Sequence, residues 1–385
     1  MNRMKMNQNN RETGIALIVA AVLLALLLLS LSSCSDDAQA DDAWRRAHAV
    51  PISFGTAADV ADPGPAIATR TAWGTLSLDG TSPGWSLRER GFGVFASHTG
   101  TYRYASSTAR PNLMWNQPVT YTNAEDVWAY SPLVYWPTTD AGADEYVSFF
   151  AYGPYSDGTT GDAAAAIVDF SLPGQTGDPW LLYQLAGTED DWRSSQVDLV
   201  WAQVLDRTRP VSVFEPVVLD FHHALACYGD GLTFAPSEAC RTRMCDLCTR
   251  YATPVSLTLT SLTLDYELTS KGRLVLNSTG DAPNWQPVLS GPLRVHRRIT
   301  LSPNQVIAHA TSATACTLTP YEASDQGIFF LPIDISGEPQ QLTVTAAYTL
   351  SIGQAGTSTL VVSLAGARAG ERHNLRLNFT LPDTY

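Results

Sequence analysis

The sequence predicts an all-β protein built from two sandwich domains in tandem. Beyond residue 50, apolar residues mostly recur at every second position, which is the periodicity of a half-buried strand. The chain also contains 27 Gly and 23 Pro, residues that the turns between many short strands require. No window has the period of a long amphipathic helix; only Ala224–Tyr228 and Glu189–Ser195 are expected to form single helical turns.

Residues 1–33 predict a lipoprotein signal peptide and are set apart from the fold. A basic start is followed by an apolar run, Ile15–Leu29, that is shorter than the ~20 residues of a membrane-spanning helix. The run leads to Leu31-Ser32-Ser33-Cys34, which resembles a bacterial lipobox. We therefore expect cleavage before Cys34 and acylation of its thiol; an uncleaved membrane anchor is the alternative.

Residues 34–49 are expected to form a flexible acidic tether. Asp36, Asp37, Asp41 and Asp42 lie here among small residues, and such a segment cannot bury enough apolar surface to fold. In lipoproteins that reach the cell surface, acidic residues after the lipidated cysteine can act as an export signal, and this stretch looks similar. A solvated linker with no targeting role is the other interpretation.

The first sandwich is predicted at residues 50–208. Turn-forming clusters such as Asp62–Pro65 and Ser82–Gly84 separate its apolar runs, and the charged segment Asp206–Pro210 marks the domain boundary. The expected strands, in order, are Val50–Thr56, Trp73–Leu78, Phe92–Ser97, Pro118–Thr122, Tyr146–Tyr152, Ala166–Leu172 and Val197–Leu205.

The second sandwich is predicted at residues 209–385. Val255–Leu268 alternates almost strictly between apolar and polar residues, as one strand of a half-buried sheet would. The other expected strands are Pro216–His222, Leu274–Leu276, Gly327–Leu331, Gln341–Ile352, Thr359–Leu364 and Asn374–Leu381. Strands at such regular spacing are typical of sandwiches.

Composition and charge exclude several classes of protein. With 45% apolar residues the chain can build a packed core, so disorder over most of its length is excluded. Its net charge of −13 argues against a nucleic-acid partner, because binding to phosphate depends on cationic contacts. Lys5 and Lys271 are the only lysines, so no Lys-rich patch for an anionic membrane surface is expected.

No motif predicts an enzyme or a cofactor. Gly80-Thr81-Ser82-Pro83-Gly84 fits the G-x-S-x-G pattern of a nucleophile elbow, but Pro83 and the absence of a following helix pattern favour a turn. His222 and His223 have no nucleophile motif beside them, which favours a structural role. The acidic run at Glu189 lacks the spacing of a calcium loop. We therefore predict no catalytic residues and no bound metal.

The cysteines cluster in the second half of the chain. Cys227, Cys240, Cys245 and Cys248 lie close in sequence, and Cys316 follows later. In an exported protein, disulfides that staple the loop at residues 228–248 are the favoured interpretation. A zinc site that also uses His222 and His223, or free thiols, are the alternatives. After lipidation of Cys34 five cysteines remain, so one stays unpaired within the monomer.

Several segments together resemble a known family. In order along the chain they are Ile52–Phe54, Thr69–Arg70, Gly93–Ala96, Met114–Val119, Trp128–Pro132, Tyr135–Pro137, Val147–Pro154, Asp198–Ala202, Leu219–Leu225, Phe329–Pro332 and Gly370–Leu377. Their order and spacing look like the fimbrillin (Mfa-like) family of type V pilus subunits, surface lipoproteins of the Bacteroidales type. The tryptophan-rich series from 114 to 154 is the most specific part.

The resemblance implies two transthyretin-like β-sandwiches and a route of assembly. The route is lipidation, export to the surface of the outer membrane, and proteolysis after an arginine that follows the first strand. A strand from another fimbrial subunit then fills the groove, which is donor-strand exchange. On this chain the first strand would be Pro51–Gly55 and the cleaved residue Arg70, with Arg45 and Arg46 as alternatives.

One departure from the family pattern concerns the end of the chain. Stalk subunits carry a donor extension beyond the last core strand, whereas this sequence stops at Tyr385, directly after that strand. The resemblance therefore implies a tip or accessory subunit of the fimbrium. The alternative is a surface lipoprotein that does not polymerise and binds a glycan or host ligand, with Trp85 and Trp180 as candidates for stacking on sugars.

Overall fold

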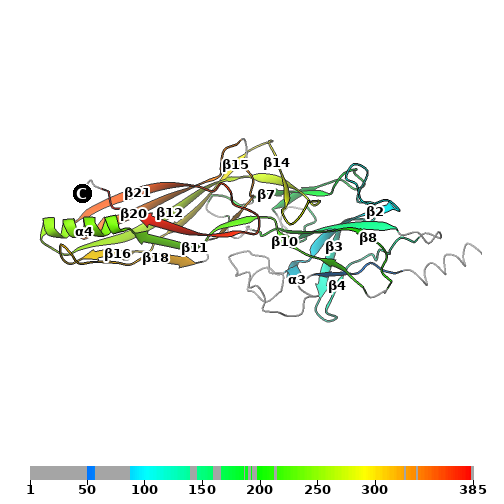
Figure 1. The fold of residues 1–385 in the computed structure, drawn as a ribbon, viewed down its shortest axis with the longest axis horizontal. Coiled ribbons are helices and arrows are strands. Elements are labelled where there is room, and N and C mark those ends of the chain that lie inside the picture. The colour runs from blue at the N-terminus through cyan, green and yellow to red at the C-terminus, as the bar shows by residue number, and fades with distance from the viewer. Residues whose placement is uncertain are drawn as a thin grey trace, which may run out of the picture. The chain divides into compact units, whose positions relative to one another are not determined.

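The computed structural model describes residues 50–56, 87–138, 145–158, 166–185, 187–189, 192, 197–211, 215–324, 327–334 and 337–382. Ile52–Tyr385 forms one compact unit. It consists mainly of strands, which confirms the predicted all-β class (Figure 1). Among these residues, no helix has both the length and the apolar character needed to cross a membrane.

A six-stranded antiparallel sheet contains most strands of the first half. It forms around β2 and β5, whose residues are nearly all buried because both faces of these strands are covered. The short helix α3 (Leu87–Arg90) leads into β2. In spatial order the strands are β10 (His222–His223), β8 (Val200–Arg207), β5 (Tyr146–Gly153), β2 (Phe92–Gly100), β3 (Met114–Thr122) and β4 (Val127–Ala129).

A four-stranded antiparallel sheet shares a hydrophobic core with this sheet. Its order is β14 (Asn284–Pro287), β13 (Lys271–Val275), β7 (Trp180–Gln184) and β6 (Ile167–Phe170). The core includes Phe150, Trp201, Leu181 and Leu274. Because β7 pairs with β13, this sheet joins strands from both sides of the predicted boundary at 208/209. The division into domains 50–208 and 209–385 stays a prediction.

Two further sheets enclose the second core. One has the order β17 (Cys316–Leu318), β16 (Gln305–Ala310), β12 (Val255–Thr269), β20 (Gln341–Leu350) and β21 (Gln354–Ser363), and β15 (Arg294–Leu301) also pairs with β12. The other has the order β18 (Tyr321–Ser324), β11 (Ala226–Pro236) and β19 (Ile328–Phe330), and β22 (Arg372–Phe379) runs parallel to β11. Facing sheets around a shared core make the architecture sandwich-like.

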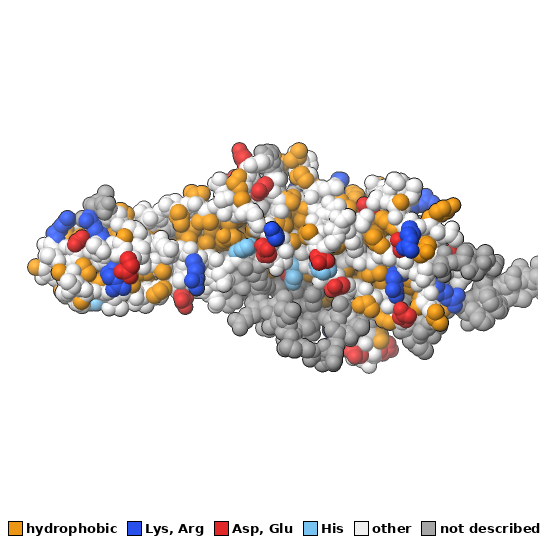
Figure 2. Space-filling model, viewed as in Figure 1, with side chains coloured by type: hydrophobic (Ala, Val, Ile, Leu, Met, Phe, Trp, Pro, Cys, Tyr) orange, Lys and Arg blue, Asp and Glu red, His pale blue; other side chains and the backbone are white. Residues whose placement is uncertain are grey.

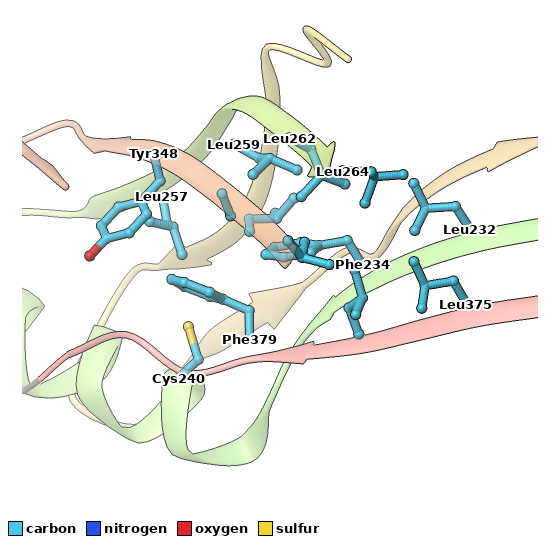
Figure 3. Close-up of a cluster of buried hydrophobic side chains, with 14 of the residues drawn as sticks. Leu232, Phe234, Cys240, Leu257, Leu259, Leu262, Leu264, Tyr348, Leu375 and Phe379 are labelled. Carbon is cyan, nitrogen blue, oxygen red and sulfur yellow. The ribbon is translucent and has the colours of Figure 1, made fainter. Parts of the chain in front are cut away.

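The long strand β12 shows how the alternating pattern is used. Leu257 and Leu259 point into the core at odd positions, whereas Leu262 and Leu264 do so at even positions (Figure 3). A shift in the pairing register between Leu259 and Ser261 absorbs the extra residue. Such a bulge lets both halves of the strand bury their leucines.

The second half contains a helix that the sequence reasoning missed. The segment predicted as a loop at 228–248 forms most of β11 and of α4 (Glu238–Tyr251), and Ala224–Tyr228 enters β11 instead of forming a helical turn. The Ser237 hydroxyl accepts a bond from the Cys240 amide and caps the helix. The helix packs against β16 (Figure 1) because its buried side chains lie mainly on one side: Cys240, Met244, Cys245, Leu247 and Cys248.

Candidate functional site

The candidate site is the segment 52–56, which ends in the short strand β1 (Phe54–Thr56). The side chain of Phe54 is 5% exposed. Its ring packs against three others at centroid distances of 5.6 to 6.1 Å: Phe92, Tyr130 and Phe149. Ile52 is buried as well. The first strand therefore fills a groove that is lined by aromatic residues from later parts of the chain.

Few main-chain bonds hold this segment. β1 pairs in parallel with β9 (Val217–Leu219), and the Val217 amide donates to the Ser53 carbonyl at 2.8 Å. On the other side the Ile52 amide donates to the Val134 carbonyl at 2.9 Å. A parallel pairing of three residues is a weak ladder, so side-chain burial supplies most of the binding of this strand. Another strand with apolar side chains at the same spacing could take its place.

Tyr130 connects the groove to the first strand. Its hydroxyl donates to the Ile52 carbonyl at 2.8 Å. Burial raises the pKa of Tyr130 from 10.0 to about 12. The folded state thus keeps a proton that the unfolded chain loses, so the free energy of unfolding falls as the pH rises through this interval.

We expect Tyr130→Phe to lower the free energy of unfolding by about 1 kcal/mol at neutral pH, because the Ile52 carbonyl loses a donor. The variant should also lose less stability than the wild type between pH 10 and 12, since it lacks the titrating hydroxyl. Urea unfolding at several pH values measures both effects. Tyr102→Phe is the matched control, because Tyr102 is 79% exposed; an equal effect from this variant would contradict the prediction.

Several residues predicted from sequence lie outside the described residues. They are Cys34, Arg45, Arg46, Arg70, Ser82 and Trp85. The structure therefore neither supports nor opposes lipidation at Cys34 or cleavage after Arg70, and both stay predictions. Of the segment that such a cleavage would release, the structure describes residues 50–56.

The cysteines are buried and have free thiols in the described part of the chain. Cys240 lies at the edge of the second core beside Phe379 (Figure 3), and burial raises the pKa of its thiol to about 11. A raised pKa opposes the thiolate that zinc requires. Among the described residues, no group of three or more His, Cys, Asp or Glu side chains could hold a metal ion. The predicted disulfides stay a prediction and are taken up below.

His223 contacts a carboxylate that the sequence reasoning did not find. Its Nδ1 lies 2.9 Å from Oδ2 of Asp198, which is 1% exposed. The contact arises because β10 pairs with β8, the strand that follows Asp198. A buried carboxylate needs a counter-charge or a donor, so we interpret this pair as structural. His222 lies 3.8 Å from the exposed Asp220.

The loop between β2 and β3 lines a cavity of about 680 Å³. Its polar lining includes His98, Tyr102, Arg103 and Arg110. Arg103 also bonds Asp206, so part of the positive charge is already compensated. His98 lies 3.2 Å from Glu145. On the face shown in Figure 2, basic side chains are scattered among acidic ones and form no continuous patch.

Trp180, a candidate for stacking on sugars, is half-buried on β7. The Arg273 guanidinium lies over its ring, 4.4 Å from the centroid. That face of the indole is therefore covered by the protein itself.

Part of the chain is similar to a known family. Residues 81–227 match a family model described as fimbrillin-like. The chain carries a fimbrillin-like region. This region holds all strands of the six-stranded sheet and the groove that receives β1. It thus contains the partner surfaces of the first strand.

Individual proteins are similar to parts of this chain. Fimbrium subunit Fim1C of Phocaeicola vulgatus is 32% identical over 114 residues, which cover 29% of this chain and 27% of that protein. This chain therefore matches about a quarter of the relative's length. Among solved structures, a Bacteroides uniformis protein with an inferred role in cell adhesion aligns with TM-score 0.38, 12% identity and coverage of 86% and 93%. The fimbrial anchor protein Mfa2 from Porphyromonas gingivalis aligns with TM-score 0.28, 11% identity and coverage of 83% and 82%.

Proposed function

We propose that this protein is a non-enzymatic subunit of a surface fimbrium, with a structural and adhesive role. Acylated Cys34 anchors the precursor in the outer membrane. Hydrolysis of the peptide bond after Arg70 then separates the segment that contains β1 from the rest of the chain. A strand from a neighbouring subunit fills the vacated groove by strand addition, in which main-chain bonds give affinity and alternate side chains give register.

The observation that carries this proposal is the burial of Phe54 in a strand with few main-chain partners. An aromatic side chain at the N-terminal end of the fold is 5% exposed, yet its strand makes only a three-residue pairing with β9. Removal of β1 would expose the rings of Phe92 and Phe149, which are fully buried with the strand in place. An exposed aromatic groove of this kind favours capture of a new strand.

We propose a tip or accessory position, in which the last described strand stays in its own subunit. β22 pairs with β11 from Cys227 to Pro236, and Leu375, Leu377 and Phe379 are buried in the second core. This strand therefore belongs to the core of its own subunit. Its release would expose several buried side chains and so lower the stability of the subunit. We propose that the subunit accepts a strand and does not donate β22.

The test is the N-terminus and mass of the protein recovered from the cell surface, with and without an arginine-specific protease. We expect a chain that starts at Thr71 within a high-mass assembly. Arg70→Ala should abolish both the new N-terminus and the assembly. Arg45→Ala and Arg46→Ala are the matched controls and should leave both unchanged.

A lipidated, intact monomer under the same conditions would contradict the proposal. It would favour the second candidate, a surface lipoprotein that binds a host or glycan ligand without polymerising. The observation in favour of this candidate is the cavity of about 680 Å³ beside Arg103 and Arg110, because its size falls in the range of ligand sites.

A further inference from the structure

Four of the buried cysteines belong to one core. Cys240, Cys245 and Cys248 lie on α4, and Cys316 lies on β17, which packs against that helix. Cys227 belongs to the other core. The grouping in space therefore differs from the grouping in sequence, where Cys316 is far from the rest.

A hydrogen bond from an arginine on α4 shows which side of this helix faces Cys316. The Arg241 guanidinium donates to the Cys316 carbonyl. Cys245 lies four residues after Arg241, and residues four apart on a helix share one face. The Cys245 side chain therefore lies on the side of α4 that faces Cys316. Besides burial, its proximity is among the causes that raise the pKa of the Cys316 thiol.

Pairings within α4, and pairings of α4 with Cys227, fit less well. Cys240 lies five residues before Cys245, roughly 140° around the helix. Cys245 and Cys248 are three residues apart, where Cβ atoms lie about 5–6 Å from each other; a disulfide needs about 3.5–4.5 Å. Cys227 lies near the far end of β11, roughly 30 Å of strand from the start of α4.

We propose that Cys245 and Cys316 form a disulfide that fastens α4 to the edge strand β17. The inference rests on the proposed export of the chain, because disulfides persist in oxidising compartments. Cys227, Cys240 and Cys248 stay as buried thiols. The bond would join the helix to β17, a three-residue strand whose one neighbour among the described strands of its sheet is β16.

The reaction is a thiol–disulfide exchange with a disulfide-bearing protein oxidase. One of the two cysteines loses its proton and attacks the disulfide of the oxidase, which forms a mixed disulfide and breaks the oxidase bond. The second thiolate attacks the sulfur of the first, and the oxidase leaves as a dithiol with two electrons and two protons. Burial raises the pKa of Cys316, so exchange should occur before the core closes around it.

Peptide mapping of the full chain, isolated from the cell envelope and alkylated under denaturing, non-reducing conditions, tests the proposal. Trypsin leaves Cys245 and Cys248 together between Arg243 and Arg250, and Asp-N then separates them by cleaving before Asp246. We expect residues 244–245 to be linked to the peptide 299–324 that contains Cys316. Three of the five described thiols should react with the alkylating reagent, since two are in the bond.

Matched variants separate this result from the proposed lipidation. Cys248→Ser should keep the linkage, whereas Cys245→Ser and Cys316→Ser should lose it and each leave one additional reactive thiol at the other position. An unlipidated Cys34 adds one reactive thiol but leaves the linked peptide unchanged, so failure of lipidation does not mimic failure of the disulfide. Five reactive thiols in the described region, zinc bound to the isolated protein, or a Cys245–Cys248 link would overturn the proposal.

Discussion

Replacement of Phe54 by alanine is expected to lower the free energy of unfolding by about 4 kcal/mol, because it removes a buried aromatic ring and leaves a cavity. The ring contacts Phe92, Tyr130 and Phe149, and all three lie on parts of the chain that follow the first strand. Urea unfolding of the purified, uncleaved protein measures the loss. Leu133→Ala is the control; its side chain is 55% exposed, and the change should be within about 0.5 kcal/mol.

The same substitution should have a second effect in protein cut after Arg70. There the first segment is held only by non-covalent contacts, so a loss of about 4 kcal/mol corresponds to roughly thousandfold weaker retention. A fluorescent peptide with the sequence of residues 50–56 can report this, because it should enter the groove faster in the cut variant than in the cut wild type. Equal rates would mean that the Phe54 ring does not limit strand exchange.

The strands were predictable where one face is buried and the other is exposed. β12, β20 and β22 show this alternation and were found from it. β14 and β18 were missed because their residues are mostly exposed or half-buried, which leaves no period to detect. β11 was missed because Gly229-Asp230-Gly231 interrupts its apolar pattern, where the register with β22 also shifts.

Helix α4 was missed because its cysteines were interpreted as disulfide or metal residues. As apolar residues, Cys240, Met244, Leu247 and Cys248 have the spacing of a helical stripe. Ser237 before them is a residue preferred at the start of a helix. Both signals were present in the sequence, and a reading of cysteine as a small hydrophobic residue would have found the helix.

The candidate site was only partly predictable. Residues 51–55 were identified through the family resemblance, and the structure describes a first strand at 54–56 in a buried groove. The contacts of that strand with Tyr130, Val134 and Val217 span more than 75 residues of sequence, and no local sequence pattern predicts them. Asp198 beside His223 arises from strand pairing in the same way.

Gly91→Ala is expected to lower the free energy of unfolding by about 3 kcal/mol, through two separate causes. Gly91 connects α3 to β2 with φ +67°, a conformation that is strained for alanine. A Cβ atom there would also lie 2.4 Å from the carbonyl oxygen of Val119 in β3. This oxygen belongs to the backbone of a strand that pairs on both sides, with β2 and β4, so it cannot move aside as a flexible side chain would.

Gly100→Ala separates the two causes. Gly100 has φ +64°, but no atom lies within 4 Å of the position of its Cβ. This variant should therefore show the conformational strain alone, about 1 kcal/mol. The remaining difference of about 2 kcal/mol measures the clash with β3. Because Gly91 also donates to Leu87 and accepts from Tyr155 through its main chain, a shift that relieved the clash would stretch both bonds. Equal losses in the two variants would mean that the β3 backbone shifts at Val119 at little cost in free energy. The sheet that lines the groove would then deform more easily than the burial of its residues indicates.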